Sequence, residues 1–159
     1  MYHVPLTTPG KLYVMPHPDP ARLEQALDEI HSCAVHMVVS LLDQLDIATL
    51  GLEREDELCA ASGLTFVHFP IADFGLPEPA PFADLVETLA NGLAAGTSMV
   101  IHCRAGVGRT GMLACCILKQ LGASAEDAVQ SVSRARGTTV PDTAEQRRFI
   151  FAYGEQRTH

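Results

Sequence analysis

The sequence predicts an α/β fold in which a mostly parallel sheet carries helices on both faces. Short apolar runs alternate with longer amphipathic stretches along the chain, and this alternation is typical of strand–helix–strand units. The apolar runs are continuous, as in strands that are buried on both faces. The 159 residues contain no repeat, linker or low-complexity tract. We therefore expect a single domain over residues 1–159.

The N-terminal half is expected to supply three strands and two helices. Residues 11–15 form a short apolar run after a segment rich in Pro, Thr and Gly, which predicts a strand. Residues 20–31 repeat apolar side chains at helical spacing. Residues 35–42 are predicted as a continuous apolar strand. Residues 54–62 are predicted as a helix that ends before a glycine, and residues 64–69 as the strand that follows.

The C-terminal half is expected to supply one strand and four helices. Residues 81–95 place four apolar side chains on one helical face, and residues 97–101 form a buried strand. Residues 109–121 are apolar over most of their length, which predicts a buried helix. Two further helices are expected over residues 124–134 and from residue 143 to about residue 153.

Acidic residues outnumber basic ones by 19 to 11, which gives a net charge of −8 and argues against nucleic acid or an anionic membrane as the main partner. Four arginines near the C-terminus could form a solvated face or fold back towards an anion site: Arg134, Arg136, Arg147 and Arg148.

No apolar stretch is long enough to span a membrane, and the first residues lack the basic and apolar regions of a signal peptide. Five cysteines, an odd number, favour a reducing compartment, so we expect the protein in the cytoplasm.

One run of ten residues carries most of the chemistry, since residues 102–111 read His-Cys-Arg-Ala-Gly-Val-Gly-Arg-Thr-Gly. The run lies between a predicted strand and a predicted helix, where free backbone N–H groups and the positive helix end favour anions. Gly106 and Gly108 allow positive φ, so successive amides can turn inward as an anion nest. Arg109 offers a planar fork for two phosphate oxygens. We expect Cys103 to face this field as a thiolate and to attack phosphorus. The residues expected to bind the phosphate group are Arg104, Ala105, Gly106, Val107 and Gly108.

A second motif supplies an acid, since residues 69–77 read Phe-Pro-Ile-Ala-Asp-Phe-Gly-Leu-Pro. Asp73 is the candidate, because a leaving oxygen must be protonated as it departs and an acid on a loop can approach it. The alternatives are a simple turn residue before a glycine, or Asp84 as the acid. Prolines beyond the acid stiffen this segment, which predicts an open, shallow cleft rimmed by Phe74 and Arg104. Alternatively, Phe74 packs inward.

These two motifs resemble those of the cysteine-based protein tyrosine phosphatases. The first matches the signature His-Cys-x5-Arg-Ser/Thr-Gly. The second is similar to the general-acid loop Trp-Pro-Asp-Phe-Gly-Val-Pro, with Ile71 and Ala72 where tryptophan and proline would stand. The order of elements resembles the small dual-specificity branch, in particular kinase-associated-phosphatase-like and bacterial members, over roughly residues 35–153. The resemblance implies a reaction through a phosphocysteine intermediate.

Four further residues are expected to support the reaction. Thr110 can donate from its hydroxyl to the sulfur of Cys103, or act at the helix start. His102 is expected to hydrogen-bond the backbone near Cys103 rather than to carry a proton. Asp142 and Gln146 lie in a segment that resembles the Val-Gln-Thr-x-x-Gln-x-x-Phe stretch of classical tyrosine phosphatases, where the first glutamine orients the hydrolytic water. The favoured alternative for this segment is helix capping by Asp142 or the threonine after it.

The expected function is hydrolysis of phosphotyrosine in proteins, with weaker action on phosphoserine and phosphothreonine and with phosphate or another oxyanion in the loop. A phosphoinositide or another small phosphate ester is the alternative substrate, but relatives that act on such lipids often place two lysines in the loop. A rhodanese-like sulfurtransferase is disfavoured by the Cys-x5-Arg spacing. A non-catalytic phosphate-binding module is disfavoured because Cys103, Arg109 and Asp73 are all intact. No cofactor is expected, and the seven histidines show no zinc-binding spacing.

Overall fold

Five strands form one sheet in the order β1-β2-β5-β3-β4 in the computed structural model, which describes residues 1–155. The strands are β1 (Tyr2–Val4), β2 (Leu12–Met15), β3 (Met37–Ser40), β4 (Thr65–His68) and β5 (Met99–His102). All neighbours pair in parallel except β1, which runs antiparallel to β2 at the edge. The predicted mostly parallel sheet is therefore confirmed. The sequence reading missed β1, because three residues are too few to show a strand period.

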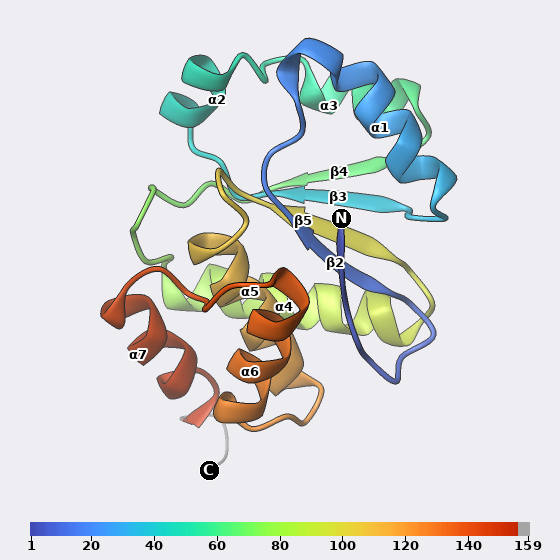
Figure 1. Cartoon of the computed structure of the whole chain (residues 1–159). Helices are drawn as coiled ribbons and strands as arrows, with labels where there is room; N and C mark the ends of the chain where they lie inside the picture. Colours follow the sequence, from blue (N-terminus) through green and yellow to red (C-terminus); the bar gives the residue numbers. More distant parts are fainter. Residues whose placement is uncertain (156–159) are drawn as a thin grey trace.

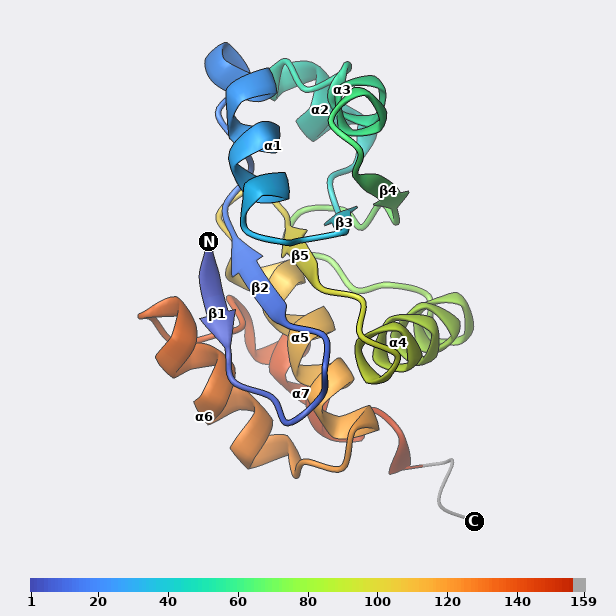
Figure 2. The ribbon, with the colours of Figure 1, turned by 90° about the vertical axis from the view of Figure 1, so that its right-hand side faces the viewer.

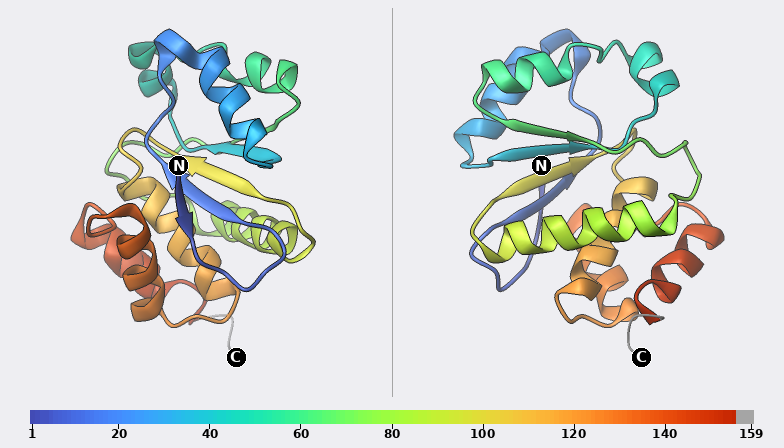
Figure 3. Two further views of the ribbon diagram at one scale, coloured as in Figure 1. Left: turned by 45° about the vertical axis from the view of Figure 1, so that its right-hand side comes forward. Right: turned by 180° about the vertical axis from the view of Figure 1, so that it is seen from behind.

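Helices cover both faces of this sheet (Figures 1 and 2). One face carries α1 (Leu23–Ser32), α2 (Gln44–Leu50) and α3 (Glu55–Ala61), with a short 3₁₀ helix over Pro20–Arg22 before α1. The other face carries α4 (Pro79–Ala94), α5 (Gly108–Gln120), α6 (Ala125–Arg136) and α7 (Ala144–Ala152). Figure 3 shows the same two layers in an oblique view and from behind. The predicted α/β architecture is thus confirmed, and the predicted elements differ from the observed ones mainly at their ends.

Helix α2 was not predicted, although its ends carry clear local signals. Asp43 caps the helix by accepting from the backbone N–H of Asp46, 2.8 Å away, and the Asp46 side chain accepts in return from the backbone N–H of Asp43. Gly51 ends the helix in the left-handed conformation at φ 74°. These caps fix the position of Asp46, which faces the core side of the helix and is buried.

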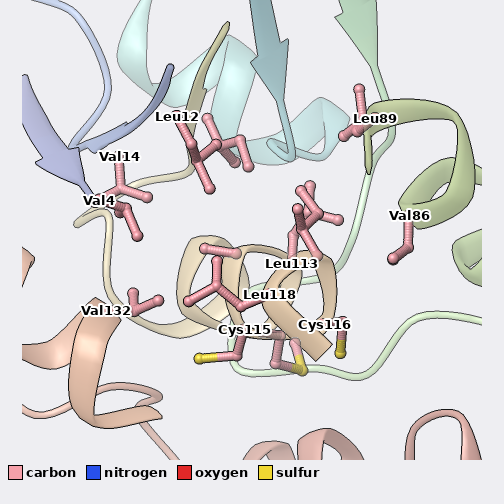
Figure 4. Packing of buried hydrophobic residues seen from close by; sticks show 14 of the residues in the cluster. Val4, Leu12, Val14, Val86, Leu89, Leu113, Cys115, Cys116, Leu118 and Val132 are labelled. Atoms are coloured by element: carbon pink, nitrogen blue, oxygen red, sulfur yellow. The ribbon is translucent and has the colours of Figure 1, made fainter. Parts of the chain in front are cut away.

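Helix α5 lies in the middle of the larger hydrophobic cluster and is buried along almost its whole length. In Figure 4 its side chains lie between those of the sheet and those of α4 and α6. Burial raises the pKa of the Cys115 thiol on this helix to about 12, so this cysteine is a packing residue. Helix α5 is packed on all sides, and β5 lies inside the sheet. Both ends of the loop that joins β5 to α5 are therefore fixed.

The end of α5 is tied to the end of α7 by a lysine. Lys119 Nζ donates to the backbone carbonyls of Ile150, Phe151 and Tyr153 at 2.8, 3.1 and 2.7 Å. These carbonyls belong to the last turn of α7 and the residues after it, where a helix leaves acceptors without partners. One ammonium group therefore closes the C-terminal end of α7 from a neighbouring helix.

Three chain-wide features can be read from the described residues. All five cysteines carry free thiols. Over residues 1–155, no helix combines the length and the hydropathy that crossing a bilayer requires. No cluster of three or more His, Cys, Asp or Glu side chains is placed to hold a metal ion in that same range.

Candidate active site

The loop between β5 and α5 lies at the carboxyl end of a central parallel strand, where ligands bind in sheets of this kind. Gly106 adopts φ 73°, and a Cβ there would overlap the backbone carbonyl of Met15 and lie 2.7 Å from the nitrogen of Pro16. A Cβ on Gly108 would overlap the carboxylate of Asp142. Both glycines are therefore required by close approach, and one of them also by its backbone conformation.

The Arg109 side chain is only 1% exposed and is held by acceptors from three segments. Its Nη1 donates to Asp46 Oδ2 at 2.6 Å and to the backbone carbonyl of Ile71 at 2.8 Å, with the carbonyl of Leu41 at 3.5 Å. One end of the guanidinium is thus committed to the protein. Nη1 is therefore not available to a phosphate oxygen. The planar fork that the sequence predicted would have to bind phosphate through the other guanidinium nitrogens.

Negative groups surround Arg109 and keep it charged. Burial by itself would lower the pKa of Arg109, but its hydrogen bond to Asp46 and nearby negative charges raise that pKa above the ordinary value. The charges come from Cys103, Asp46 and Asp73. For Asp46, burial acts to raise the pKa, while the hydrogen bond and charge of Arg109 lower it below the usual range.

Asp73 lies beside the same guanidinium. Its Oδ1 is 3.0 Å from Arg109 Nη2, so the loop after β4 meets the first turn of α5. Nη2 has this ion-pair contact but makes no aligned hydrogen bond within residues 1–155, which leaves its N–H groups free to turn to a ligand. Phe74, the next residue, is 61% exposed at φ 59°, so the alternative in which it packs inward is wrong.

The segment before α7 meets both loops. Thr143 is the N-cap and forms a capping box with Gln146, so the cap is the threonine and not Asp142. The amide of Gln146 also donates to the carbonyl of Gly75, two residues beyond the acid, at 3.4 Å. The side chain of Asp142 lies against Gly108. Burial and then the charge of nearby Asp73 raise the pKa of Asp142.

His102, the last residue of β5, is fully buried under the loop. Its Nδ1 lies 3.4 Å from the carbonyl oxygen of Cys103, the backbone contact that the sequence predicted. Its Nε2 is 2.6 Å from Oε2 of Glu55, a buried residue at the start of α3. These two contacts fix the ring of His102 between the start of the loop and α3.

The remaining predicted residues lie in or beside the loop. Cys103 is buried where the loop begins. Arg104 is half-exposed, with Nη1 3.6 Å from Asp46 Oδ1. Thr110 is fully buried, and its hydroxyl has no hydrogen-bond partner among residues 1–155. The predicted hydrogen bond from Thr110 to the sulfur of Cys103 is therefore not made in this structure, in which the hydroxyl is left without an acceptor.

Sequence reasoning missed Asp46 and Glu55, the two carboxylates that hold Arg109 and His102. The spacing of Asp43 and Asp46 is a capping signal that could have predicted α2. It does not reveal that the second aspartate turns to an arginine 63 positions away. For Glu55 the acidic run at residues 55–57 indicates only a helix start.

The comparisons with known proteins agree with this geometry. A model of the family described as "Polymorphic toxin system, DSP-PTPase phosphatase" matches residues 15–123. Human cyclin-dependent kinase inhibitor 3 is 25% identical over 136 residues, which cover 84% of this chain and 64% of that protein. Protein tyrosine phosphatase domain-containing protein 1 of Danio rerio is 30% identical over 100 residues, or 58% of this chain and 14% of that protein.

Solved structures share the fold. Kinase associated phosphatase, with its catalytic-site cysteine replaced by serine, superposes with a TM-score of 0.82 at 23% identity, covering 93% of this chain and 86% of the other. Tk-PTP in its active form gives a TM-score of 0.75 at 22% identity, covering 98% and 97%. At these identities the likeness establishes the fold alone. The family model, however, spans well over half of the chain, which therefore belongs to the DSP-PTPase phosphatases, a dual-specificity-like group of the cysteine-based protein tyrosine phosphatases.

Proposed function

We propose that this chain hydrolyses phosphotyrosine in proteins through a phosphocysteine intermediate on Cys103. The observation that carries the proposal is the meeting of the two loops at Arg109. Asp73 Oδ1 lies 3.0 Å from Arg109 Nη2, and Cys103 is buried at the start of the loop that leads to Arg109. A nucleophile, an anion-binding arginine and an acid thus gather in one site, which is what phosphoryl transfer to a thiolate requires.

In the first step the loop holds the phosphoryl group. The backbone N–H groups of residues 104–108 and the free nitrogens of Arg109 bind its oxygens, with Nη1 remaining on Asp46. The Cys103 thiolate attacks phosphorus, so a P–S bond forms and the ester P–O bond breaks. Asp73 gives its proton to the departing oxygen. When phosphate enters, Arg109 Nη2 turns from Asp73 to a phosphate oxygen.

In the second step water attacks the phosphocysteine. A P–O bond forms, the P–S bond breaks, and the thiolate of Cys103 is restored, while Asp73 takes the proton from water. The buried hydroxyl of Thr110, which otherwise has no partner within residues 1–155, donates to the departing thiolate. Asp142 and Gln146, which lie against Gly108, help to place the water.

The surface around the loop favours an aromatic phosphate ester. Phe74 and Leu76 of the acid loop are 61% and 46% exposed, and Leu45, next to Asp46, is 75% exposed. The exposed aromatic ring of Phe74, next to Asp73, provides a surface for the phenyl ring of phosphotyrosine. Half-exposed Arg104 can contact an acidic residue of a peptide. We expect weaker action on phosphoserine and phosphothreonine and little on inositol lipids.

The test compares kcat/KM for phosphotyrosine peptides, phosphothreonine peptides and a phosphoinositide. We expect phosphotyrosine to be the best substrate, Phe74→Ala to reduce that preference about fivefold to tenfold, equivalent to about 1–1.4 kcal/mol, and Cys103→Ser to lose turnover. Leu121→Ala, an exposed apolar residue at the far end of α5, is the matched control and should leave the preference unchanged.

Each outcome of this comparison supports or contradicts the proposed mechanism or the proposed substrate class. Turnover that survives in Cys103→Ser would overturn the cysteine mechanism. A clear preference for the phosphoinositide would replace the substrate class while leaving the roles of Asp73 and Arg109 in place. Oxyanion binding by wild-type protein with no turnover of any ester would favour a phosphate-binding module.

We also infer a reducing compartment such as the cytoplasm. Support comes from the five unpaired thiols, one of which is the proposed nucleophile. Fractionation of the native host with an antibody against this chain tests the inference, and recovery from an oxidising compartment would contradict it.

A further inference from the structure

Three consecutive carbonyl groups of the loop are each held by a donor from outside it. The donors belong to β5, to the segment after β2 and to α6; the first directly precedes the loop, and the other two come from distant parts of the chain. The pairs are His102 Nδ1 with Cys103 O at 3.4 Å, His17 N with Arg104 O at 3.2 Å, and Arg136 Nη2 with Ala105 O at 2.9 Å.

These contacts decide where the amide N–H groups of the loop point. In a trans peptide plane, the C=O of one residue and the N–H of the next point in opposite directions. Carbonyls that are held outward therefore turn the N–H groups of residues 104, 105 and 106 towards the concave side of the loop. Within residues 1–155 these three N–H groups donate no hydrogen bond. They are thus available to an anion.

Arg136 makes the shortest of the three contacts, from the last turn of α6. Its guanidinium also lies over the ring of Tyr2 in β1, 4.6 Å from the ring centre. Its Nε is buried and has no hydrogen-bond partner in the described chain. The side chain is thus fixed between the edge strand and the loop, and its position leaves one donor unsatisfied.

We propose that Arg136 is a positioning residue for the reaction. It holds the peptide between Ala105 and Gly106 in the orientation that aims the Gly106 N–H at a phosphate oxygen, and Tyr2 holds Arg136 in place. The proposal rests on the proposed function in one respect only, that this loop binds the phosphoryl group.

The test measures anion binding apart from turnover. In the Cys103→Ser background, titration calorimetry gives the Kd for inorganic phosphate with and without Arg136→Ala. In the active protein, kinetics give kcat, KM and inhibition by vanadate, which adopts the five-coordinate geometry of the transferring group. Arg134→Ala is the matched control, since it is an exposed arginine in the same turn of α6.

We expect Arg136→Ala to weaken phosphate binding about tenfold, because one donor is misdirected rather than removed. The value of kcat should fall by a similar factor, with a smaller change in KM, and vanadate should lose more affinity than phosphate. Arg136→Lys keeps the charge but has no planar group to bond the carbonyl while lying on the ring, so it should recover only part of the loss. Arg134→Ala should change none of these values.

A second variant guards against failure to fold. Tyr2→Ala removes the ring beneath the guanidinium and should weaken phosphate binding about threefold, whereas Tyr2→Phe should not. A folded Arg136→Ala protein with unchanged phosphate affinity would overturn the proposal. So would full recovery in Arg136→Lys, because that would assign the effect to charge alone. If the protein binds phosphate in the expected pattern but turns over no ester, the proposed function fails and the positioning role stands.

Discussion

Replacing Asp46 by asparagine tests how Arg109 is held at the anion site. Asp46 and Arg109 are 5% and 1% exposed, and Asp46 Oδ2 accepts from Arg109 Nη1 at 2.6 Å. Asparagine has nearly the same shape and keeps one oxygen to accept this hydrogen bond. The substitution therefore removes the negative charge while the contact itself can persist.

The expected loss follows from this geometry. Unit charges 2.6 Å apart attract by about 6 kcal/mol at an effective dielectric constant of about 20, and desolvation offsets much of that gain. Removing one partner of a buried pair costs about 3–5 kcal/mol. The oxygen that remains in Asp46→Asn recovers about 1 kcal/mol. We therefore expect the free energy of unfolding to fall by about 2–4 kcal/mol, which lowers Tm by about 5–15 °C in a domain of this size.

The pH dependence provides a second signature. The pKa of Asp46 is lowered in the folded protein, so its contribution to stability is complete above the unfolded pKa, about 3.9, and is lost as pH falls through the lower folded value. The difference in unfolding free energy between wild type and Asp46→Asn should therefore be constant above about pH 5 and shrink below about pH 4.

Urea unfolding followed by circular dichroism at several pH values measures both effects. Asp43→Asn is the control, since asparagine caps helices as well as aspartate and Asp43 does not touch Arg109. In phosphatase assays, Asp46→Asn should lower kcat/KM about tenfold or more, equivalent to about 1.4 kcal/mol, because Arg109 loses its anchor. If the two variants had the same free energy of unfolding at pH 7 and the same dependence on pH below about pH 4, the ion pair with Asp46 would not hold Arg109 as we argue.

Three further predictions concern the same site. Asp73→Asn should lower the rate for phosphotyrosine by about 10²–10⁴-fold but affect activated aryl phosphates little, which a series of leaving groups would measure; a uniform loss would assign the acid elsewhere. Glu55→Gln should lower stability by about 1–3 kcal/mol, because His102 loses its carboxylate partner, and should slow iodoacetate alkylation of Cys103, whose carbonyl lies beside the same ring; unchanged alkylation would separate His102 from the nucleophile. Gly106→Ala should cut kcat/KM at least about 100-fold, since a Cβ overlaps Met15 and the positive φ adds about 1–2 kcal/mol of strain, and near-normal kinetics would contradict the close approach.

The loop and its flanking elements were predictable because the chemistry is local. Cys103 and Arg109 lie six positions apart, and the apolar runs on either side define the strand and the helix. Asp73 was found for the same reason, from the residues that follow it. Most predicted strand and helix ends differ from the observed ones by one or two residues. The exact start of a helix is set by its N-cap, such as Ser124 or Thr143, and not by its apolar period.

The two carboxylates that hold Arg109 and His102 could not be predicted, because only the fold brings them close to their partners. Asp46 is 63 positions from Arg109, and Glu55 is 47 positions from His102. Each carboxylate lies in the first turn of a short helix, where acidic residues are common for reasons unrelated to a partner. Helix α2 itself has seven residues, and exposed Leu45 within it breaks any apolar stripe. A periodicity argument has too little to detect there.

The three carbonyls held by Lys119 have a consequence for amide hydrogen exchange. They close one end of α7, while at the other end the Gln146 side chain donates to the carbonyl of Gly75 in the acid loop. The helix cannot fray from either end without releasing a contact to α5 or to that loop. Amides of α7 should then exchange with the protection of a cooperative unit shared with α5, not with the fast exchange usual for fraying helix ends. Under this coupling, Lys119→Met should raise exchange along α7 and, through Gln146, alter how long the acid loop stays beside the phosphate site.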